Sequence, residues 1–455
     1  MDGTVIYFNG IDLEKKRAGE SPYHFPPKTV AAFLSENRVL EDPDPRLNAM
    51  DVIEGIDPTS LAETGWGLIV HESEDKEVLE ALAPLLQKRR RDAGAMYREM
   101  TFYNNDTTES FRKRNQAASG DANPKKLPYY LLIVGSPELI PFSFQTDLDF
   151  SYAVGRLTFH RVESYRQYAA NVVKHENEPK PHPHRFHLFA VNNGEPLTEL
   201  SCNRLAAPIQ EALAERSGGG SRRSWAIEAT PPQEATRHRL LSLFSPETKP
   251  DILFTAGHGV VYDGDTATRE RLQGGLVCSD WQAGRPPSEQ QCLFGHDLTP
   301  DMDFSGLIWF FFSCYTAGTP ALSITRSPDQ KADRLHPHSF VASLPRALLA
   351  HERGALAVVG HVEQCYQHSF LWHDEIGETD HFASALARLL EGVPVGYAME
   401  HFQRRLGEIA TAYLGRMHDP NPPDEEEMRL FWITFQDARY YIVLGDPAVR
   451  LGGAV

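Results

Sequence analysis

Apolar residues along the chain gather in short runs that alternate with longer amphipathic stretches. Short apolar runs between turn-forming residues are typical of buried strands, and apolar residues three and four positions apart are typical of helices. The expected strands lie at residues 66–70, 129–134, 186–191, 251–254, 307–312, 355–359 and 440–444. The expected helices lie at residues 76–91, 162–175, 203–215, 234–244, 339–351, 382–390 and 395–413. This alternation predicts an α/β fold with a mainly parallel sheet and helices on both faces.

Polar and turn-rich stretches separate these elements. Residues 104–126 contain the basic cluster Arg112-Lys113-Arg114 and predict an exposed loop, either a solvated linker or a site of proteolytic processing. Residues 262–304 predict a long, turn-rich insertion, and residues 424–427 predict an acidic loop.

The 455 residues exceed the usual size of one hydrophobic core, so we expect more than one lobe. Prolines at positions 179, 181 and 183 mark the boundary between the two main lobes. Residues 1–60 are rich in turn-formers and predict an extended arm. The remaining lobes are residues 61–180 and residues 181–455.

Charge, apolar content and cysteine count disfavour several classes of protein. A formal net charge of -17 and a pI of about 5.6 disfavour a protein that binds a nucleic-acid backbone. No basic segment followed by a long apolar core begins the chain, and the purest apolar run is only Leu307 to Phe312, so we expect neither secretion nor a membrane span. Five scattered cysteines, an odd number, predict reduced thiols in a cytoplasmic protein.

Two expected strands end in chemically capable side chains. His258 stands between two glycines after the strand at 251–254, and Cys314 follows Ser313 after the strand at 307–312. Sites in open α/β sheets form at the carboxyl ends of the strands, so we expect both side chains at one rim. A nucleophile and a proton carrier together are sufficient for cysteine-based acyl transfer.

Each residue also has a structural interpretation. A lone cysteine is most often a packing residue, and a lone histidine is most often hydrogen-bonded in the core. The turn-prone segment after Cys314 and the positive end of a following helix favour an exposed thiolate instead. Glycines beside His258 permit close approach of the backbone, so the N–H of Gly259 could stabilise an oxyanion.

The order of motifs resembles the caspase-hemoglobinase superfamily of cysteine peptidases (clan CD), in particular its gingipain-like and bacterial caspase-like CHAT branches. The resemblance covers roughly residues 60–452. It is carried by His258-Gly259, Ser313-Cys314, the strand at 353–360, the closing segment 444–451, and upstream by 131–135, Ile140-Pro141 and 154–157. It implies a caspase-like α/β/α sandwich at 181–455, preceded by a smaller, non-catalytic caspase-like lobe at 61–180.

In such enzymes the cysteine attacks the peptide carbonyl and the histidine protonates the departing amine. The resemblance therefore implies that Cys314 and His258 are catalytic, with the backbone N–H groups of Gly259 and Cys314 as the oxyanion hole. A third, orienting acid is not dictated; Glu363 and Asp251 are both candidates. The resemblance further implies a regulated bacterial endopeptidase, acting in signalling or defence on a partner protein, with room for a regulatory partner.

A basic residue at P1, the substrate position before the cut bond, would need an acidic pocket. Asp147 and Asp149 lie where gingipain-like enzymes place such an acid, and Glu363 is a further candidate for this S1 pocket. The structural interpretation makes Asp147 and Asp149 surface or helix-cap residues.

Two groups of metal-binding residue types remain: His361 to His368 with His373, and Cys278, Cys292 and His296. The first follows the strand at 355–359, so pocket lining or a plain loop is the preferred interpretation, and we expect no metal or other cofactor. Two competing functions stay open. One is a catalytically silent caspase-like adaptor, and the other is a metal-dependent hydrolase using residues 361–373.

Overall fold

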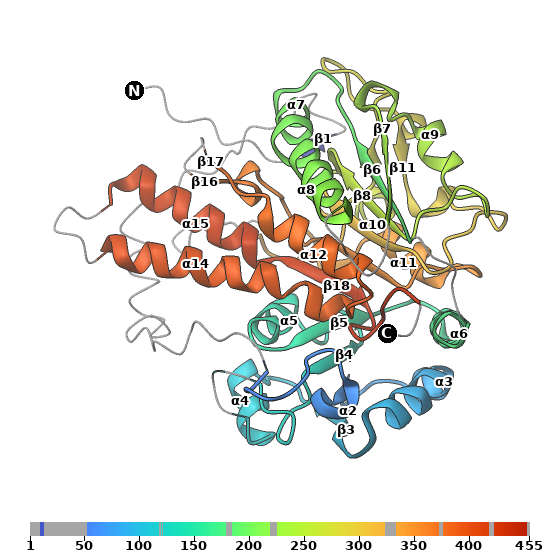
Figure 1. Cartoon of the computed structure of the whole chain (residues 1–455), viewed down its shortest axis with the longest axis vertical. Coiled ribbons are helices and arrows are strands. Elements are labelled where there is room, and N and C mark those ends of the chain that lie inside the picture. The colour runs from blue at the N-terminus through green and yellow to red at the C-terminus, as the bar shows by residue number, and fades with distance from the viewer. Residues whose placement is uncertain are drawn as a thin grey trace.

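A computed structural model describes residues 10–12, 52–117, 120, 122–178, 184–218, 225–323, 334–372, 376–417 and 423–452 (Figure 1). The predicted arm at 1–60 lies mostly outside these residues, and so does His373.

One ten-stranded sheet runs through the molecule and confirms the predicted α/β class. Its strands, in spatial order, are β3 (Tyr97–Phe102), β2 (Trp66–His71), β4 (Tyr130–Val134), β5 (Ala153–Leu157), β18 (Tyr441–Gly445), β15 (Ala357–His361), β12 (Ile308–Phe312), β8 (Ile252–Ala256), β6 (His184–Ala190) and β7 (Trp225–Thr230). All neighbouring pairs are parallel except β15 with β18. The sheet is therefore two parallel blocks of opposite direction that meet at β15 and β18.

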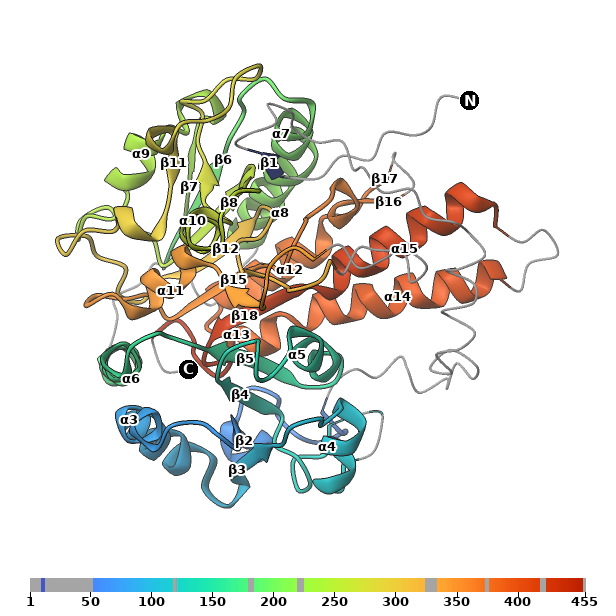
Figure 2. The same ribbon diagram turned by 180° about the vertical axis from the view of Figure 1, so that it is seen from behind.

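Helices cover both faces of the sheet. On one face α3 (Lys76–Ala93), α6 (Val162–Asn177) and α11 (Ser343–Ala350) pack in a row, and on the other α8 (Ala207–Gly218), α12 (Asp380–Leu390) and α14 (Glu400–Met417) do so. In Figure 1, α8, α12 and α14 lie to the left of the strands and α3, α6 and α11 to their right, and Figure 2 shows the two sides exchanged. A short helix, α10 (Thr266–Leu272), packs against α11. The last helix, α15 (Glu425–Arg439), packs against α14.

Burial explains why the strand prediction succeeds in the interior of the sheet. All five residues of β12, Ile308 to Phe312, are buried, as are all five of β8. Strands covered on both faces need apolar side chains at every position, which gives the continuous runs visible in the sequence. The ring of Phe310 is tilted against that of Phe254 on the neighbouring strand and meets Phe382 of α12 edge-on.

A buried ion network joins the first block to the end of the chain. Asp446, which follows β18, accepts hydrogen bonds from Arg89 Nε at 2.6 Å and from Trp66 Nε1 at 2.9 Å. Arg89 also pairs with Glu176 at 2.6 Å. Arg89 and Asp446 are almost completely excluded from solvent, so their charges are compensated by each other and by these partners.

Two predicted loops, 104–126 and 424–427, are wrong because they contain helical residues, and the predicted insertion at 262–304 contains short helices and strands. Residues 104–126 include α4 (Thr108–Arg114), begun by a capping box between Thr107 and Ser110 and anchored by the buried Phe111. The insertion 262–304 carries α10 together with β10 (Leu276–Val277) and β11 (Cys292–Leu293), which form a small sheet with β1 (Gly10–Asp12) and β9 (Gly259–Val261). The acidic stretch at 424–427 is the start of α15, whose first amide groups are capped by Asp424.

Candidate active site

The register of β8 and β12 brings His258 and Cys314 to neighbouring positions. Ala256 pairs with Phe312, and each candidate residue stands two positions beyond its strand. The N–H of Gly257 still donates to the carbonyl of Phe312 at 3.2 Å, so the pairing continues past the strand ends. The predicted meeting of the two residues at one rim is therefore a property of the sheet.

Gly259 is fixed by its contact with the nucleophile candidate. A Cβ atom at position 259 would lie 2.0 Å from the carbonyl oxygen of Cys314 and 3.0 Å from its nitrogen. Those atoms belong to the backbone and cannot rotate away. Only glycine permits this close approach of the two chain segments.

The thiol of Cys314 is buried and turned toward the segment after β15. Its Sγ accepts the backbone N–H of Cys365 at 3.1 Å and lies 3.6 Å from the carbonyl oxygen of Cys365. The exposed fraction of Cys314 is 0%. In this conformation a substrate carbonyl cannot reach the sulfur.

Unusual backbone geometry surrounds the thiol. Tyr315 has φ of +59° and Glu363 has φ of +75°, in the left-handed region that bulky residues rarely adopt. The N–H of Tyr315 donates to the carbonyl of Glu363 at 2.6 Å, so the two strained residues hold each other. Such strain costs about 1–3 kcal/mol per residue and is concentrated at functional sites.

His258 is equally buried and is electrically neutral. Within the described residues neither ring nitrogen has a hydrogen-bond partner, so the imidazole is not bonded to the Cys314 thiol. Burial lowers the pKa of His258 to about 3. Its ring meets Trp281 edge-on at 6.3 Å between centroids. The resting site therefore lacks a thiolate and imidazolium pair.

A buried polar network lies behind Cys365, and the sequence did not indicate it. The hydroxyl of Tyr441 lies 3.0 Å from Cys365 Sγ and 2.8 Å from Ser369 Oγ, and Ser369 donates to Asp437. Asp437 also accepts the N–H of Tyr366 at 2.8 Å. Burial raises the pKa of Asp437. Because Cys365 contacts the Cys314 sulfur, this network fixes the position of the thiol.

The structure separates the two candidates for an orienting acid. Asp251 precedes β8, where it accepts the backbone N–H of Arg185 at 2.9 Å. A five-residue strand spans about 16 Å, so Asp251 lies at the end of β8 remote from His258. Glu363 is fully buried, and its carboxylate accepts Ser323 Oγ at 2.5 Å. Its backbone bond to Tyr315 places it beside Cys314.

The S1 candidates fall into two groups. Asp147, near the end of α5 (Phe142–Asp149), pairs with Arg439 and accepts Thr108 Oγ1 at 3.2 Å. The charges of Asp147 and Glu363 both contribute to raising the pKa of Tyr440, after the larger effect of its burial, so these two acids share one neighbourhood.

Asp149, by contrast, is the half-buried last residue of α5. It accepts the N–H of Val154 at 3.1 Å, and burial raises the pKa of its carboxyl well above its ordinary value. The guanidinium of the buried Arg156 lies within electrostatic reach of it. These contacts indicate that the Asp149 carboxyl has a structural role beside β5.

Neither metal alternative gathers its ligands among the described residues. His361 Nε2 bonds the carbonyl oxygen of Asp437 at 3.0 Å, and the Cys365 sulfur contacts Tyr441. Cys278 and Cys292 are buried beside β10 and β11, whereas His296 lies at the surface on Phe294. Within the described ranges, neither set brings three ligand atoms close enough for one ion.

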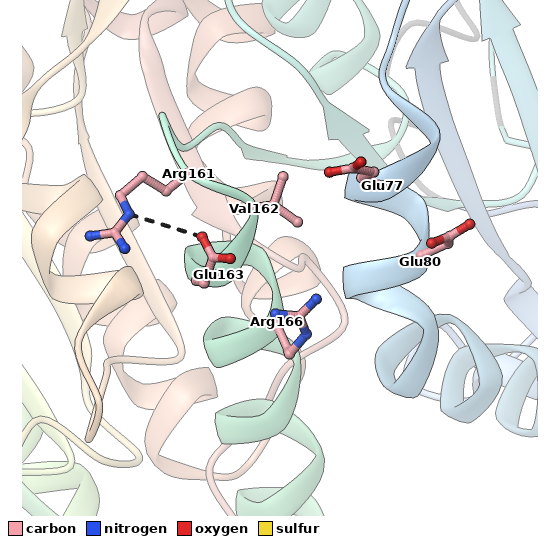
Figure 3. A pocket seen from close by; sticks show the side chains of 6 residues that line it. All are labelled: Glu77, Glu80, Arg161, Val162, Glu163 and Arg166. Atoms are coloured by element: carbon pink, nitrogen blue, oxygen red, sulfur yellow. Dashed lines mark ion pairs between the residues drawn. The ribbon is translucent and has the colours of Figure 1, made fainter.

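A surface hollow between α3 and α6 is unrelated to these residues. It has a volume of about 440 Å³ and is lined by Glu77, Glu80, Arg161, Val162, Glu163 and Arg166 (Figure 3). The Arg161 and Glu163 side chains, 4.0 Å apart, are 77% and 65% exposed, so their ion pair is weak. No nucleophilic cysteine or histidine lines the hollow.

Comparisons with known proteins add a distant likeness. No protein-family model matches the chain, and no curated protein does. A solved structure described as "Structure of Protease" has 14% sequence identity and a TM-score of 0.48, over 86% of this chain and 80% of that chain. A likeness of this size does not establish a shared activity. None of the helices in the described ranges has both the length and the apolar character needed to cross a membrane.

Proposed function

We propose that this protein is a caspase-like cysteine endopeptidase in which Cys314 is the nucleophile and His258 the proton carrier. The observation that supports it is the placement of both residues at neighbouring strand ends, with the Gly259 backbone packed on that of Cys314. Packing alone does not require two strained residues, Tyr315 and Glu363, around a thiol. Residues 61–180 would then form the non-catalytic lobe and residues 181–455 the catalytic one.

In the proposed reaction, Cys314 Sγ attacks the carbonyl carbon of the scissile peptide bond and His258 takes the thiol proton. The oxyanion of the tetrahedral intermediate is held by the N–H groups of Gly259 and Cys314. His258 then returns the proton to the departing amine, which leaves a thioester on Cys314. Water attacks the thioester, releases the acid product and restores the thiol.

The resting geometry supports a regulated enzyme. Cys314 and His258 are both fully buried, and the low pKa of His258 keeps the imidazole neutral. Opening the site to water would raise that pKa toward its ordinary value of 6.5 and allow an ion pair between the His258 imidazolium and the Cys314 thiolate. We propose that a partner protein induces this opening. The family resemblance extends the proposal to a bacterial, cytoplasmic protease that cuts a protein in signalling or defence.

For the S1 pocket we favour Glu363, assisted by Asp147. Glu363 is bonded through its backbone to the residue after the nucleophile, whereas the carboxylate of Asp149 accepts the backbone N–H of Val154. A carboxylate at this place would bind an arginine or lysine at P1. The ion pair of Asp147 with Arg439 supports this proposal, because a guanidinium already lies beside this acid.

The test is cleavage of a diverse peptide library by the wild type, Cys314→Ala, His258→Ala and, as a matched control, Cys202→Ala. Cys202 is a buried thiol whose pKa burial raises to about 12, so its removal leaves any cysteine chemistry intact. The assays are repeated at urea concentrations too low to unfold the protein, so that molecules with an opened site are also tested. The proposal predicts cleavage that is abolished by Cys314→Ala and retained by Cys202→Ala; equal cleavage by wild type and Cys314→Ala would overturn it.

The alternative is a catalytically silent caspase-like binding module. The complete burial of the Cys314 sulfur favours it. That alternative predicts that the wild type cleaves no peptide at any urea concentration. It also predicts that the Cys314→Ala variant binds a partner protein as well as the wild type does.

A further inference from the structure

Three side chains that the proposed peptidase chemistry does not use meet beside the candidate active site. Glu270 lies on α10, and His336 and His338 precede β14 (Phe340–Val341). Their ligand atoms all lie within 4.8 Å of one another. Glu270 Oε1 is 3.1 Å from His338 Nε2 and 3.6 Å from His336 Nε2.

The ring of His336 is oriented as a metal ligand would be. Its Nδ1 lies 2.7 Å from the carbonyl oxygen of His338 and 3.4 Å from the backbone nitrogen of the same residue. The carbonyl contact is much the shorter, and a carbonyl only accepts, so we assign the proton to Nδ1. This leaves the Nε2 lone pair pointing toward Glu270. Metal-bound histidines commonly donate their other ring N–H to a backbone carbonyl in this way.

The His336 Nε2 atom is also buried without a hydrogen-bond partner in the described part of the chain. His336 is 1% exposed, so water does not supply that partner freely. A buried polar atom left in this state costs about 1–3 kcal/mol. A cation between Nε2 and the Glu270 carboxylate would remove this cost.

The distances suit a small tetrahedral ion. Zinc lies about 2.0–2.2 Å from nitrogen and oxygen ligands, which places neighbouring ligand atoms about 3.3 Å apart. The two observed contacts of Glu270, 3.1 and 3.6 Å, bracket this value. The side chains of His338 and Glu270 are 38% and 28% exposed, so the fourth position faces water.

A positive group also lies near Glu270. The guanidinium of Arg346, which contacts His160, lies within electrostatic reach of the Glu270 carboxylate. It partly neutralises Glu270 in the metal-free protein. A divalent cation bound by two imidazoles would provide a stronger and directional counter-charge.

We propose that Glu270, His336 and His338 bind one Zn²⁺ ion, with water as the fourth ligand. The ion would join α10, which follows the His258 segment, to the segment that leads from Cys314 into β14. These segments already touch, because a Cβ on Gly274 would lie 2.2 Å from the carbonyl oxygen of Tyr315. The ion would thus hold together two segments that follow the candidate catalytic residues. This site does not depend on the proposed peptidase activity.

The test is metal binding by the full chain without a histidine tag, using Co²⁺ as a spectroscopic probe and Zn²⁺ in competition with a chelating dye. Glu270→Gln and His338→Gln remove partly exposed ligands with little risk to folding. His296→Gln is the matched control, since His296 also faces a glutamate, Glu289, at 3.6 Å but has no second histidine beside it among the described residues.

We expect one equivalent of Co²⁺ with visible bands of a tetrahedral complex, displaced by Zn²⁺, and a rise in Tm with Zn²⁺. Both signals should be lost in Glu270→Gln and His338→Gln and kept in His296→Gln. Absence of stoichiometric binding, or binding that survives both ligand substitutions, would overturn the site. Because neither readout uses peptide cleavage, failure of the peptidase proposal would leave this result unchanged.

Discussion

Replacing Gly259 with alanine tests whether the close contact between the two site-bearing segments matters. The added Cβ would lie 2.0 Å from the carbonyl oxygen of Cys314, more than 1 Å inside ordinary van der Waals contact. The clashing atom belongs to the backbone, so the Cys314 segment itself must move by about 1 Å. Overpacking of this kind costs about 1–3 kcal/mol of stability.

Displacement of a catalytic group by 1 Å lowers turnover by about 100-fold. We therefore expect Gly259→Ala to lower kcat/KM by about 100-fold while the protein stays folded. The matched control is Gly415→Ala in α14, where the added Cβ meets nothing within 4 Å. Alanine in an open helical position should stabilise by up to about 1 kcal/mol and leave activity unchanged.

The assays are urea unfolding and cleavage of the best library peptide, measured on both variants and the wild type. If Gly259→Ala matched the wild type in both stability and kcat/KM, the backbone contact would not position Cys314. Equal losses in Gly259→Ala and Gly415→Ala would also refute the reasoning, because they would mark a general effect of the substitution.

Three further predictions concern pH, specificity and the buried network. The pKa of His258 is about 3 in the folded protein and about 6.5 in the unfolded chain, so the unfolded chain binds the proton first as pH falls. Between pH 7 and pH 5 the wild type should therefore lose about 2 kcal/mol more of its free energy of unfolding than His258→Gln, measured by urea unfolding. Equal losses would contradict the buried neutral state. Glu363→Gln should lower kcat/KM by about 30-fold or more for peptides with a basic P1 residue and leave kcat/KM unchanged for peptides with an apolar P1 residue, measured with paired fluorogenic substrates. Equal losses of kcat/KM for both kinds of peptide would refute the pocket. Asp446→Ala should cost about 3–5 kcal/mol, because it removes the partner of the buried Arg89 Nε and Trp66 Nε1 and leaves the Arg89 charge compensated mainly by Glu176. Breaking the exposed Arg90 to Glu99 pair should cost under about 1 kcal/mol. Similar costs of the two changes in urea unfolding would contradict this account.

The interior of the sheet could be predicted because its strands are apolar throughout. The edge strand β3 could not, since only two of its six residues are buried and two adjacent charged residues, Arg98 and Glu99, interrupt its apolar pattern. The start of α15 is acidic and resembles a loop until Asp424 is recognised as its cap. In α4, the single buried Phe111 leaves no periodicity to detect.

The candidate site, too, could be predicted only in part. His258 and Cys314 could be located because both end buried parallel strands, whose carboxyl ends share one rim. The contacts of Cys365 with Tyr441 and of Glu270 with His338 could not be, because each joins segments far apart in the chain. Their proximity depends on how α10, β15 and β18 are placed by the fold.

The most direct measurement of the central proposal is the site of covalent modification by peptidyl electrophiles. The intact mass and the modified peptide would be determined after reaction across the urea series, for wild type, Cys314→Ala, His258→Ala and Cys202→Ala. We predict one adduct on Cys314, absent from Cys314→Ala, strongly slowed in His258→Ala and unchanged in Cys202→Ala. An adduct on another cysteine, or labelling that ignores both Cys314 and His258, would contradict the proposed peptidase.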